Sequence, residues 1–223
     1  MRPLTRRELL AIYRRLHRRF GPRQWWPAET PFEVVVGAVL TQNTAWTNVE
    51  RAIANLKQAR ALTPERLLTA PAARVARWIR PAGYFNLKAR RLRAVVAWWR
   101  RAHPRAVRRR PLQSLRQELL GVYGVGPETA DSILLYALGR PSFVVDAYTK
   151  RIFARHGWVR WAAGYEELQR TFTRALPARV PLYNEYHALL VELGKTFCRA
   201  RRPNCQACPL RDLGTLRLEP GAR

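Results

Sequence analysis

Three cysteines near the carboxyl end of the chain are the first residues whose spacing suggests chemistry. They are the only cysteines among 223 residues, and they are Cys198, Cys205 and Cys208. An odd number of cysteines in one short segment argues against a disulfide scaffold and favours a local metal or cluster site. A structural zinc ion is the weaker alternative, because no histidine lies near them in the sequence to complete a tetrahedron.

A glycine-containing turn between two helical patterns could bind an anion without a charged side chain. In LLGVYGVGPETADSILLYAL, residues 119–138, Gly124 and Gly126 flank Val125, and Pro127 opens the second helix. Glycine allows a tight turn in conformations that other residues avoid. Backbone N–H groups at the start of the second helix would then face outward and could bind phosphate. An ordinary helix–turn–helix corner is the alternative for such a pair taken alone.

A polar connection follows the most apolar segment of the chain. Thr30-Pro31-Phe32-Glu33 has the form of a capping box with proline in the first turn, which predicts a buried helix through Leu40. Thr47-Asn48-Val49-Glu50 repeats the box and predicts a second helix. A polar loop without a further role is one interpretation of the connection between them. Its polar side chains, Gln42 and Asn43 among them, are free to point outward, and Trp46 follows on the same connection.

Helical periodicity dominates the rest of the chain and strand signals are sparse, which predicts an all-α fold. No run approaches the roughly 18 apolar residues of a membrane span, and the N-terminal segment lacks a signal-peptide core. We therefore expect a cytoplasmic protein. Residues 100–110 are interpreted as a basic, solvent-exposed connector. The other expected helices are 64–68, 72–79, 86–99, 112–120, 127–138, 147–155, 164–175 and 182–193.

The charge balance favours a polyanionic partner. Lysine and arginine number 41 against 15 acidic residues, which gives a net charge of +26. Such an excess causes self-repulsion unless a partner neutralises it, and nucleic acid is the first candidate. An anionic membrane surface is the second candidate. Codon bias could explain why almost all the cations are arginine, but it does not explain the scarcity of acids.

Five segments, taken in their order and spacing, resemble the endonuclease III-type, helix-hairpin-helix superfamily of DNA glycosylases. They are PFEVVVGAVLTQNT, AGYFNLKARRL, VYGVGPETA, FVVDAYTKRI and CRARRPNCQACPL. The resemblance implies two helical domains flanking a DNA-binding cleft, a six-helix domain of residues 31–140 and a second of residues 1–30 plus 141–223. It also implies a monomer, associated with the nucleoid, that binds double-stranded DNA containing damaged bases. Its hairpin would grip the DNA backbone through Gly124, Val125, Gly126 and Thr129.

The resemblance identifies Asp146, in FVVDAYTKR, as the catalytic carboxylate. Breaking an N-glycosidic bond builds positive charge on the deoxyribose, and a fixed carboxylate stabilises that charge and can orient or deprotonate water. A helix N-cap before Ala147 is the structural alternative, and the two roles are compatible. Lys150 lies four residues further on, where it could pair with Asp146.

Family members that also cleave the DNA strand carry a lysine in the second hairpin helix. The corresponding position here is Glu128. A carboxylate cannot form a Schiff base with the sugar. The sequence therefore predicts hydrolytic base removal without efficient AP-lyase activity.

The cysteines match the first three ligands of the family's [4Fe–4S] cluster, which four thiolates normally hold. The fourth position, separated from Cys208 by five residues, is Gly214. Three explanations stay open: a non-cysteine ligand such as Asp212 or solvent, a labile cluster, or a lost cluster. In each case neighbouring arginines predict a contact with DNA phosphate, namely Arg199, Arg201, Arg202 and Arg211.

A glycosylase must extrude its target nucleotide and fill the hole. The resemblance puts the duplex wedge at Gln42 and Asn43. WWP and the aromatic residue after TQNT resemble the base pocket of the 3-methyladenine branch, where an electron-rich stack favours a cationic base. Hydrophobic core is the alternative for any single tryptophan. The implied base pocket consists of Trp25, Trp26, Trp46 and Lys195.

Together these features predict a monofunctional DNA glycosylase of base excision repair. Its expected substrate is an alkylated purine such as 3-methyladenine. A thymine or uracil mismatch glycosylase is the alternative within the same class, because base identity depends on pocket shape. A non-catalytic DNA-binding protein that uses the hairpin as a grip is the alternative from another class.

Overall fold

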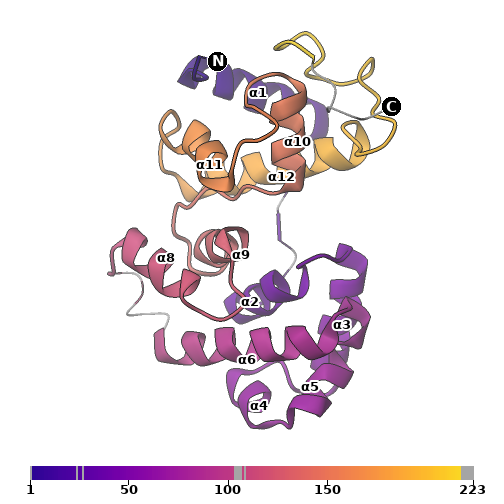
Figure 1. Ribbon diagram of the computed structural model, residues 1–223, viewed down its shortest axis with the longest axis vertical. Coiled ribbons are helices and arrows are strands. Elements are labelled where there is room, and N and C mark those ends of the chain that lie inside the picture. The colour runs from indigo at the N-terminus through magenta and orange to yellow at the C-terminus, as the bar shows by residue number, and fades with distance from the viewer. Residues whose placement is uncertain (1, 24, 27, 103–106, 108, 217–223) are drawn as a thin grey trace. The chain divides into compact units, whose positions relative to one another are not determined.

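A computed structural model of the chain describes residues 2–23, 25, 26, 28–102, 107 and 109–216 (Figure 1). Every regular element in that part is a helix, so the predicted all-α fold is confirmed. The chain divides into two compact units, residues 1–25 with 141–223 and residues 26–140. The unit of residues 26–140 has the same last residue as the expected six-helix domain of residues 31–140, but it begins five residues earlier, at Trp26. No helix in the described ranges is long and apolar enough to cross a membrane.

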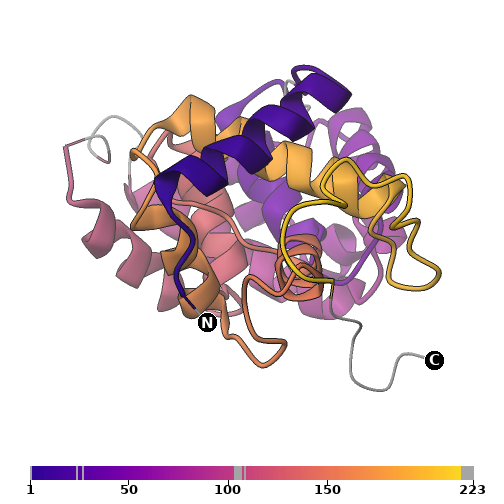
Figure 2. The same cartoon turned by 90° about the horizontal axis from the view of Figure 1, so that it is seen from above.

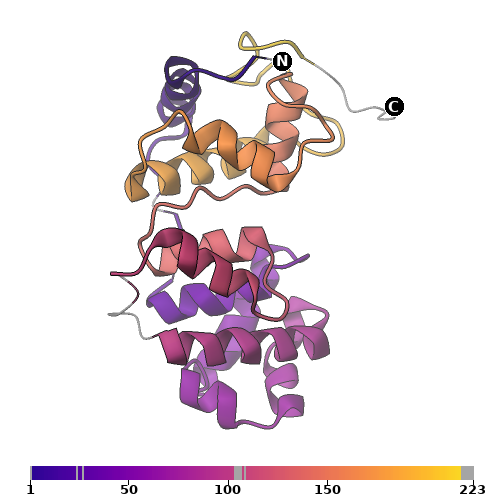
Figure 3. The ribbon, with the colours of Figure 1, turned by 60° about the vertical axis from the view of Figure 1, so that its left-hand side comes forward.

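The unit of residues 26–140 is built around a helix that is buried on all sides. This helix, α2, begins after Thr30, whose hydroxyl accepts the Glu33 N–H, and its residues Phe32 to Leu40 are all buried. Helix α6 packs against it, and Figure 3 shows α9 of the hairpin on its other side. The described helices are α2 (Pro31–Leu40), α3 (Trp46–Gln58), α4 (Pro64–Thr69), α5 (Ala72–Trp78), η1 (Arg80–Ala82), α6 (Phe85–Ala102), α8 (Leu112–Leu120), α9 (Pro127–Ser132) and the π-helical turn η2 (Ile133–Ala137).

Two local predictions in this unit were wrong. Helix α3 begins at Trp46 after the N-cap Ala45, so Thr47 lies inside the first turn and does not cap the helix. Helix α6 continues to Ala102, and Val107 is buried with its carbonyl accepting from the Arg140 guanidinium. The predicted solvent-exposed connector is therefore partly helix and partly core. Its residues 103–106 and 108 lie outside the described part of the chain.

The other unit joins the N-terminal helix to the C-terminal half of the chain. Thr5 and Glu8 form a complete capping box at its start. Figure 2 shows this helix lying across the long C-terminal helix, and the Tyr186 hydroxyl donates to the Leu9 carbonyl between them. The described helices are α1 (Arg6–Phe20), α10 (Ala147–Arg155), α11 (Tyr165–Thr173) and α12 (Val180–Thr196).

A buried segment without regular secondary structure, residues 142–145, leads into α10. Phe143 is fully buried, and its ring stacks on that of Phe172 with 3.9 Å between centroids. Tyr183 and Tyr186 of α12 meet the Phe143 ring edge-on. This aromatic core fixes the chain immediately before Asp146.

Candidate active site and DNA-contacting segments

Asp146 caps helix α10, and only one of its two carboxylate oxygens is used for the cap. Oδ1 accepts from the Thr149 N–H at 2.7 Å and from the Thr149 hydroxyl at 2.8 Å. Oδ2 lies 3.5 Å from Nε2 of His187, and the Asp146 side chain is 12% exposed. The helix cap therefore uses Oδ1, and Oδ2 is the oxygen that a catalytic role would use.

His187, on α12, was not singled out from the sequence. Burial by itself would raise the pKa of Asp146, but the contacts with His187 and Thr149 outweigh burial and hold that pKa below its usual value. Lys150, which could have paired with Asp146, makes no ion pair with it among the described residues, because the carboxylate turns toward Thr149 and His187. The only signal in the sequence was a histidine on the apolar face of a predicted helix.

Trp25 and Lys195 continue the run of contacts that begins at Asp146. The Trp25 ring meets the His187 ring edge-on with 6.1 Å between centroids. Nζ of Lys195 lies 5.5 Å from the centre of the Trp25 ring. The indole Nε1 of Trp25 is buried and has no hydrogen-bond acceptor among the described residues. Two of the four predicted pocket residues are thus connected to Asp146 within one unit.

The other two predicted pocket residues, Trp26 and Trp46, belong to the unit of residues 26–140. Their rings meet edge-on at 5.4 Å, and Trp26 also packs against Tyr136 at 4.9 Å. A Cβ atom on Gly37 would lie 3.4 Å from the Trp26 ring, so the glycine lets the indole approach α2 closely. Neither unit by itself contains all four pocket residues. Pro27 of the WWP motif lies outside the described residues.

The hairpin turn has two glycines with different structural roles. Gly124 has φ +80°, and a Cβ atom there would overlap Cγ of Arg91, so this position requires glycine. Gly126 has φ −93° and is the N-cap of α9, and a Cβ atom there would meet nothing within 4 Å. Val125 is buried between them. The first-turn N–H groups of α9 have no acceptor within the helix.

Gln42, predicted as part of the wedge, is engaged within its own unit. Its Nε2 donates to the Gly124 carbonyl at 3.0 Å and to the Thr129 hydroxyl at 3.1 Å. Its Oε1 accepts from Nη1 of Arg91 at 2.6 Å. Gln42 therefore stabilises the hairpin, and the Thr129 hydroxyl is one of the two groups that it binds there. Asn43, which is exposed and has φ +53°, is the wedge candidate that still points outward.

Two exposed tyrosines were not singled out from the sequence. Tyr84 is 71% exposed with φ +44°, and Tyr123, in the hairpin turn, is 55% exposed. Exposed aromatic rings are the groups on which nucleic-acid bases stack. The signal that could have identified Tyr84 is an aromatic residue immediately after glycine in AGYFNLKA.

The three cysteines lie near one another at the C-terminal end of α12 and in the loop after it. Cys198 and Cys208 are buried. Burial raises the pKa of the Cys208 thiol, and the neighbouring thiols of Cys198 and Cys205 raise it further. Nη1 of Arg155 lies 3.5 Å from Sγ of Cys198 and donates to the Arg199 carbonyl at 2.6 Å. No three His, Cys, Asp or Glu side chains of the described residues are already arranged to hold a metal ion.

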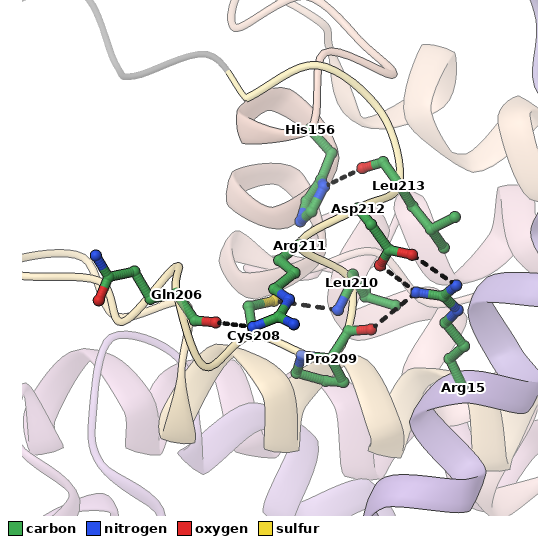
Figure 4. Close-up of polar contacts among 9 residues, drawn as sticks. All are labelled: Arg15, His156, Gln206, Cys208, Pro209, Leu210, Arg211, Asp212 and Leu213. Atoms are coloured by element: carbon green, nitrogen blue, oxygen red, sulfur yellow. Dashed lines mark hydrogen bonds and ion pairs between the residues drawn. The ribbon is translucent and has the colours of Figure 1, made fainter.

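The expected position of the fourth ligand is closed to any side chain. Gly214 has φ +78°, and a Cβ atom there would overlap the His156 carbonyl oxygen and lie 2.5 Å from Nε1 of Trp158. The residues present thus offer three thiolates and no fourth cysteine. Arg15 binds both carboxylate oxygens of Asp212, the suggested substitute ligand (Figure 4).

His156, which is distant from the cysteines in the sequence, lies against this loop. Nδ1 of His156 lies 2.7 Å from the Leu213 carbonyl oxygen, a contact drawn in Figure 4. The Thr215 N–H donates in turn to the His156 carbonyl. His156 therefore anchors the loop through hydrogen bonds that use its backbone and its ring.

Residues 36–178 match the helix-hairpin-helix superfamily of base excision DNA repair proteins. Residues 198–213 match the iron–sulfur binding domain of endonuclease III. A protein of Methanocaldococcus jannaschii, whose name describes it as a candidate DNA repair glycosylase, is 49% identical over 205 residues. That alignment covers 90% of this chain and 93% of the relative.

Solved structures show the same fold. An endonuclease III–DNA complex superposes with a TM-score of 0.79 at 24% identity, covering 95% of each chain. The H. pylori 3-methyladenine DNA glycosylase bound to 1,N6-ethenoadenine superposes with a TM-score of 0.70 at 27% identity. That superposition covers 86% of this chain and 98% of the glycosylase.

Proposed function

Because the chain belongs to the helix-hairpin-helix superfamily of base excision DNA repair proteins, we propose that it hydrolyses the bond between deoxyribose and an alkylated purine. At the level of its family the protein is a DNA glycosylase of the endonuclease III type that binds DNA. The proposal adds the chemistry, the catalytic residue and the kind of base. The run of contacts from Asp146 through His187 to Trp25 and Lys195 carries it.

Asp146 is the proposed catalytic residue. As the base departs, positive charge develops on the sugar, and a fixed carboxylate stabilises it more strongly in a dry site than in water. The depressed pKa of Asp146 keeps the carboxylate ionised near neutral pH despite its burial. Oδ2, which is not used in the cap, is the oxygen available to the sugar or to the attacking water.

The distribution of lysines supports hydrolysis without strand cleavage. The chain has Lys57, Lys88, Lys150 and Lys195, and none of them lies in the hairpin, where Glu128 occupies the first turn of α9. Strand cleavage by this family requires an amine that attacks the sugar, and a carboxylate cannot form the Schiff base. Trapping with borohydride would detect an amine that reached the sugar from any other position.

The proposed base is an alkylated purine such as 3-methyladenine. The similarity to the H. pylori 3-methyladenine glycosylase supports it. One face of the Trp25 ring is already in contact with the Lys195 ammonium, so that face is not available for cation–π attraction to a charged base. The buried Nε1–H of Trp25 instead offers a donor for a purine ring nitrogen, since an unpaired buried donor costs about 1–3 kcal/mol.

The residues that bind duplex DNA are proposed to belong to the unit of residues 26–140. The open first turn of α9 behind Gly126 would bind a backbone phosphate. The exposed side chains of Asn43 and Tyr84 would enter the base stack when the target nucleotide leaves it. The family's iron–sulfur cluster, if bound, would be held by Cys198, Cys205 and Cys208 and would serve as a structural support, with a non-protein fourth ligand.

The test is a panel of duplexes that differ only in one base. Separate substrates carry 3-methyladenine, 1,N6-ethenoadenine, uracil opposite guanine and thymine opposite guanine, and abasic sites are scored after incubation. We expect release of the alkylated purines. Release of thymine or uracil alone would favour the mismatch glycosylase, and binding without any release would favour a non-catalytic protein.

A further inference from the structure

Lys88, on α6, is a buried lysine outside the site described above. It is 1% exposed, and its ammonium donates to the Leu40 carbonyl at 2.8 Å and to the Ala82 carbonyl at 2.7 Å. Burial and the nearby charge of Arg91 lower its pKa to about 8. Removing an ammonium group from water is costly, and the two hydrogen bonds to carbonyl oxygens offset part of that cost.

The two carbonyls that Lys88 binds belong to the last residues of two helices. Leu40 is the final residue of α2, and Asn43 follows it in the connection to α3. Ala82 is the final residue of η1, and Tyr84 follows it before α6. A helix-end carbonyl has no partner within its helix, and here one ammonium group satisfies both ends at once.

Asn43 and Tyr84 share an uncommon backbone conformation. Both have positive φ, +53° and +44°, in the left-handed region that side chains other than glycine rarely adopt. Such conformations persist only where the surrounding structure fixes them. The carbonyls that Lys88 joins lie three residues before Asn43 and two residues before Tyr84 along the chain.

We infer that Lys88 is a positioning residue that holds Asn43 and Tyr84 in the geometry with which they enter the duplex. The inference rests on the proposed function of these two side chains. Arg91, one turn further along α6, holds the hairpin in place in a similar way. Its guanidinium donates to Gln42, and the aliphatic part of its side chain packs against Gly124. A single helix thereby fixes the three segments proposed to contact DNA.

The test measures base-stack insertion apart from excision. The probe is a duplex with 2-aminopurine next to a tetrahydrofuran abasic analogue, whose fluorescence rises when protein side chains disturb the stack. Lys88→Met is compared with the wild-type protein and with Lys57→Met, which removes a partly exposed lysine of the same unit that pairs with Glu29 and Glu33. We expect Lys88→Met to reduce the fluorescence change about tenfold, because small misplacements of positioned groups have large effects.

A double-mutant cycle separates positioning from general loss of structure. In an Asn43→Ala, Tyr84→Ala background, Lys88→Met should have no further effect on the signal, because the groups that it positions are gone. Affinity for undamaged duplex should change less than about twofold, as expected when phosphate contacts persist. Lys88→Gln, which keeps a donor for one carbonyl, replaces Lys88→Met if the latter does not fold.

Two results would overturn the inference in distinguishable ways. If the Asn43→Ala, Tyr84→Ala protein gives a normal signal, the proposed insertion by these residues fails, and the role of Lys88 fails with it. If that protein is defective but Lys88→Met and Lys88→Gln are normal, or if Lys88→Met acts equally in both backgrounds, the insertion stands. In that case Lys88 has only a structural role.

Discussion

The carboxylate of Asp146 lies 3.5 Å from the imidazole of His187, which joins the start of α10 to the middle of α12. The cap of α10 uses Oδ1, and the contact with His187 uses Oδ2. The same residue can therefore begin a helix and present an ionised oxygen. His187 also connects Asp146 to Trp25, which makes it the centre of the candidate active site.

The first prediction concerns the pH dependence of excision by His187→Leu. The active form has an ionised Asp146, and the contact with His187 is one of the interactions that hold its pKa low. Without that contact burial still raises the pKa of Asp146, so the acidic limb of the pH–rate profile should move to higher pH. His17→Leu, outside this run of contacts, is the control. An unchanged acidic limb would mean that His187 does not influence the carboxylate.

The second prediction separates the two hairpin glycines. Gly124→Ala should lower the free energy of unfolding by about 1–3 kcal/mol, because φ is +80° and the methyl group would overlap Arg91. Gly126→Arg should leave stability nearly unchanged, since the position is open, but should weaken binding to damaged and undamaged duplexes alike. Gly126→Ala is the matched control. A binding defect restricted to one lesion would contradict phosphate contact at this turn.

The third prediction concerns the closed fourth position of the cysteine loop. Gly214→Cys should not increase the iron content of anaerobically purified protein, because no side chain fits beside Trp158 and the His156 carbonyl. Its melting temperature should fall as much as that of Gly214→Ala, which tests the steric effect alone. A gain of bound iron in Gly214→Cys, with no loss of stability, would show that the position is open to a fourth thiolate.

Sequence patterns predicted the elements that local interactions determine. The helix after Thr30 and the helix after Asp146 follow from caps that lie directly next to the residues they stabilise. Helix α3 shows the limit of this reasoning. Thr47 and Glu50 satisfied the capping pattern, yet the helix begins at Trp46, whose indole N–H donates to Glu50 and whose ring packs on Trp26.

Contacts between distant parts of the chain could not be predicted from the same patterns. His187 reaches Asp146, and Arg91 reaches Gln42, only because helices far apart in sequence pack together. The sequence marked Gly214 as a missing ligand but could not show that Trp158 fills the space. The wedge prediction for Gln42 depended likewise on a side chain being free, and tertiary hydrogen bonds engage it.

The most direct test of the central claim is a single-turnover reaction of the wild-type protein and Asp146→Asn on a duplex containing 3-methyladenine. We predict that the wild-type protein releases the base and leaves the strand intact until alkali is added, without a borohydride-trapped adduct. Asp146→Asn should slow release at least about a hundredfold while DNA affinity is retained, because the carboxylate acts on charge that develops in the transition state. Near-normal release by Asp146→Asn, or high-yield trapping of the wild-type protein, would contradict the account.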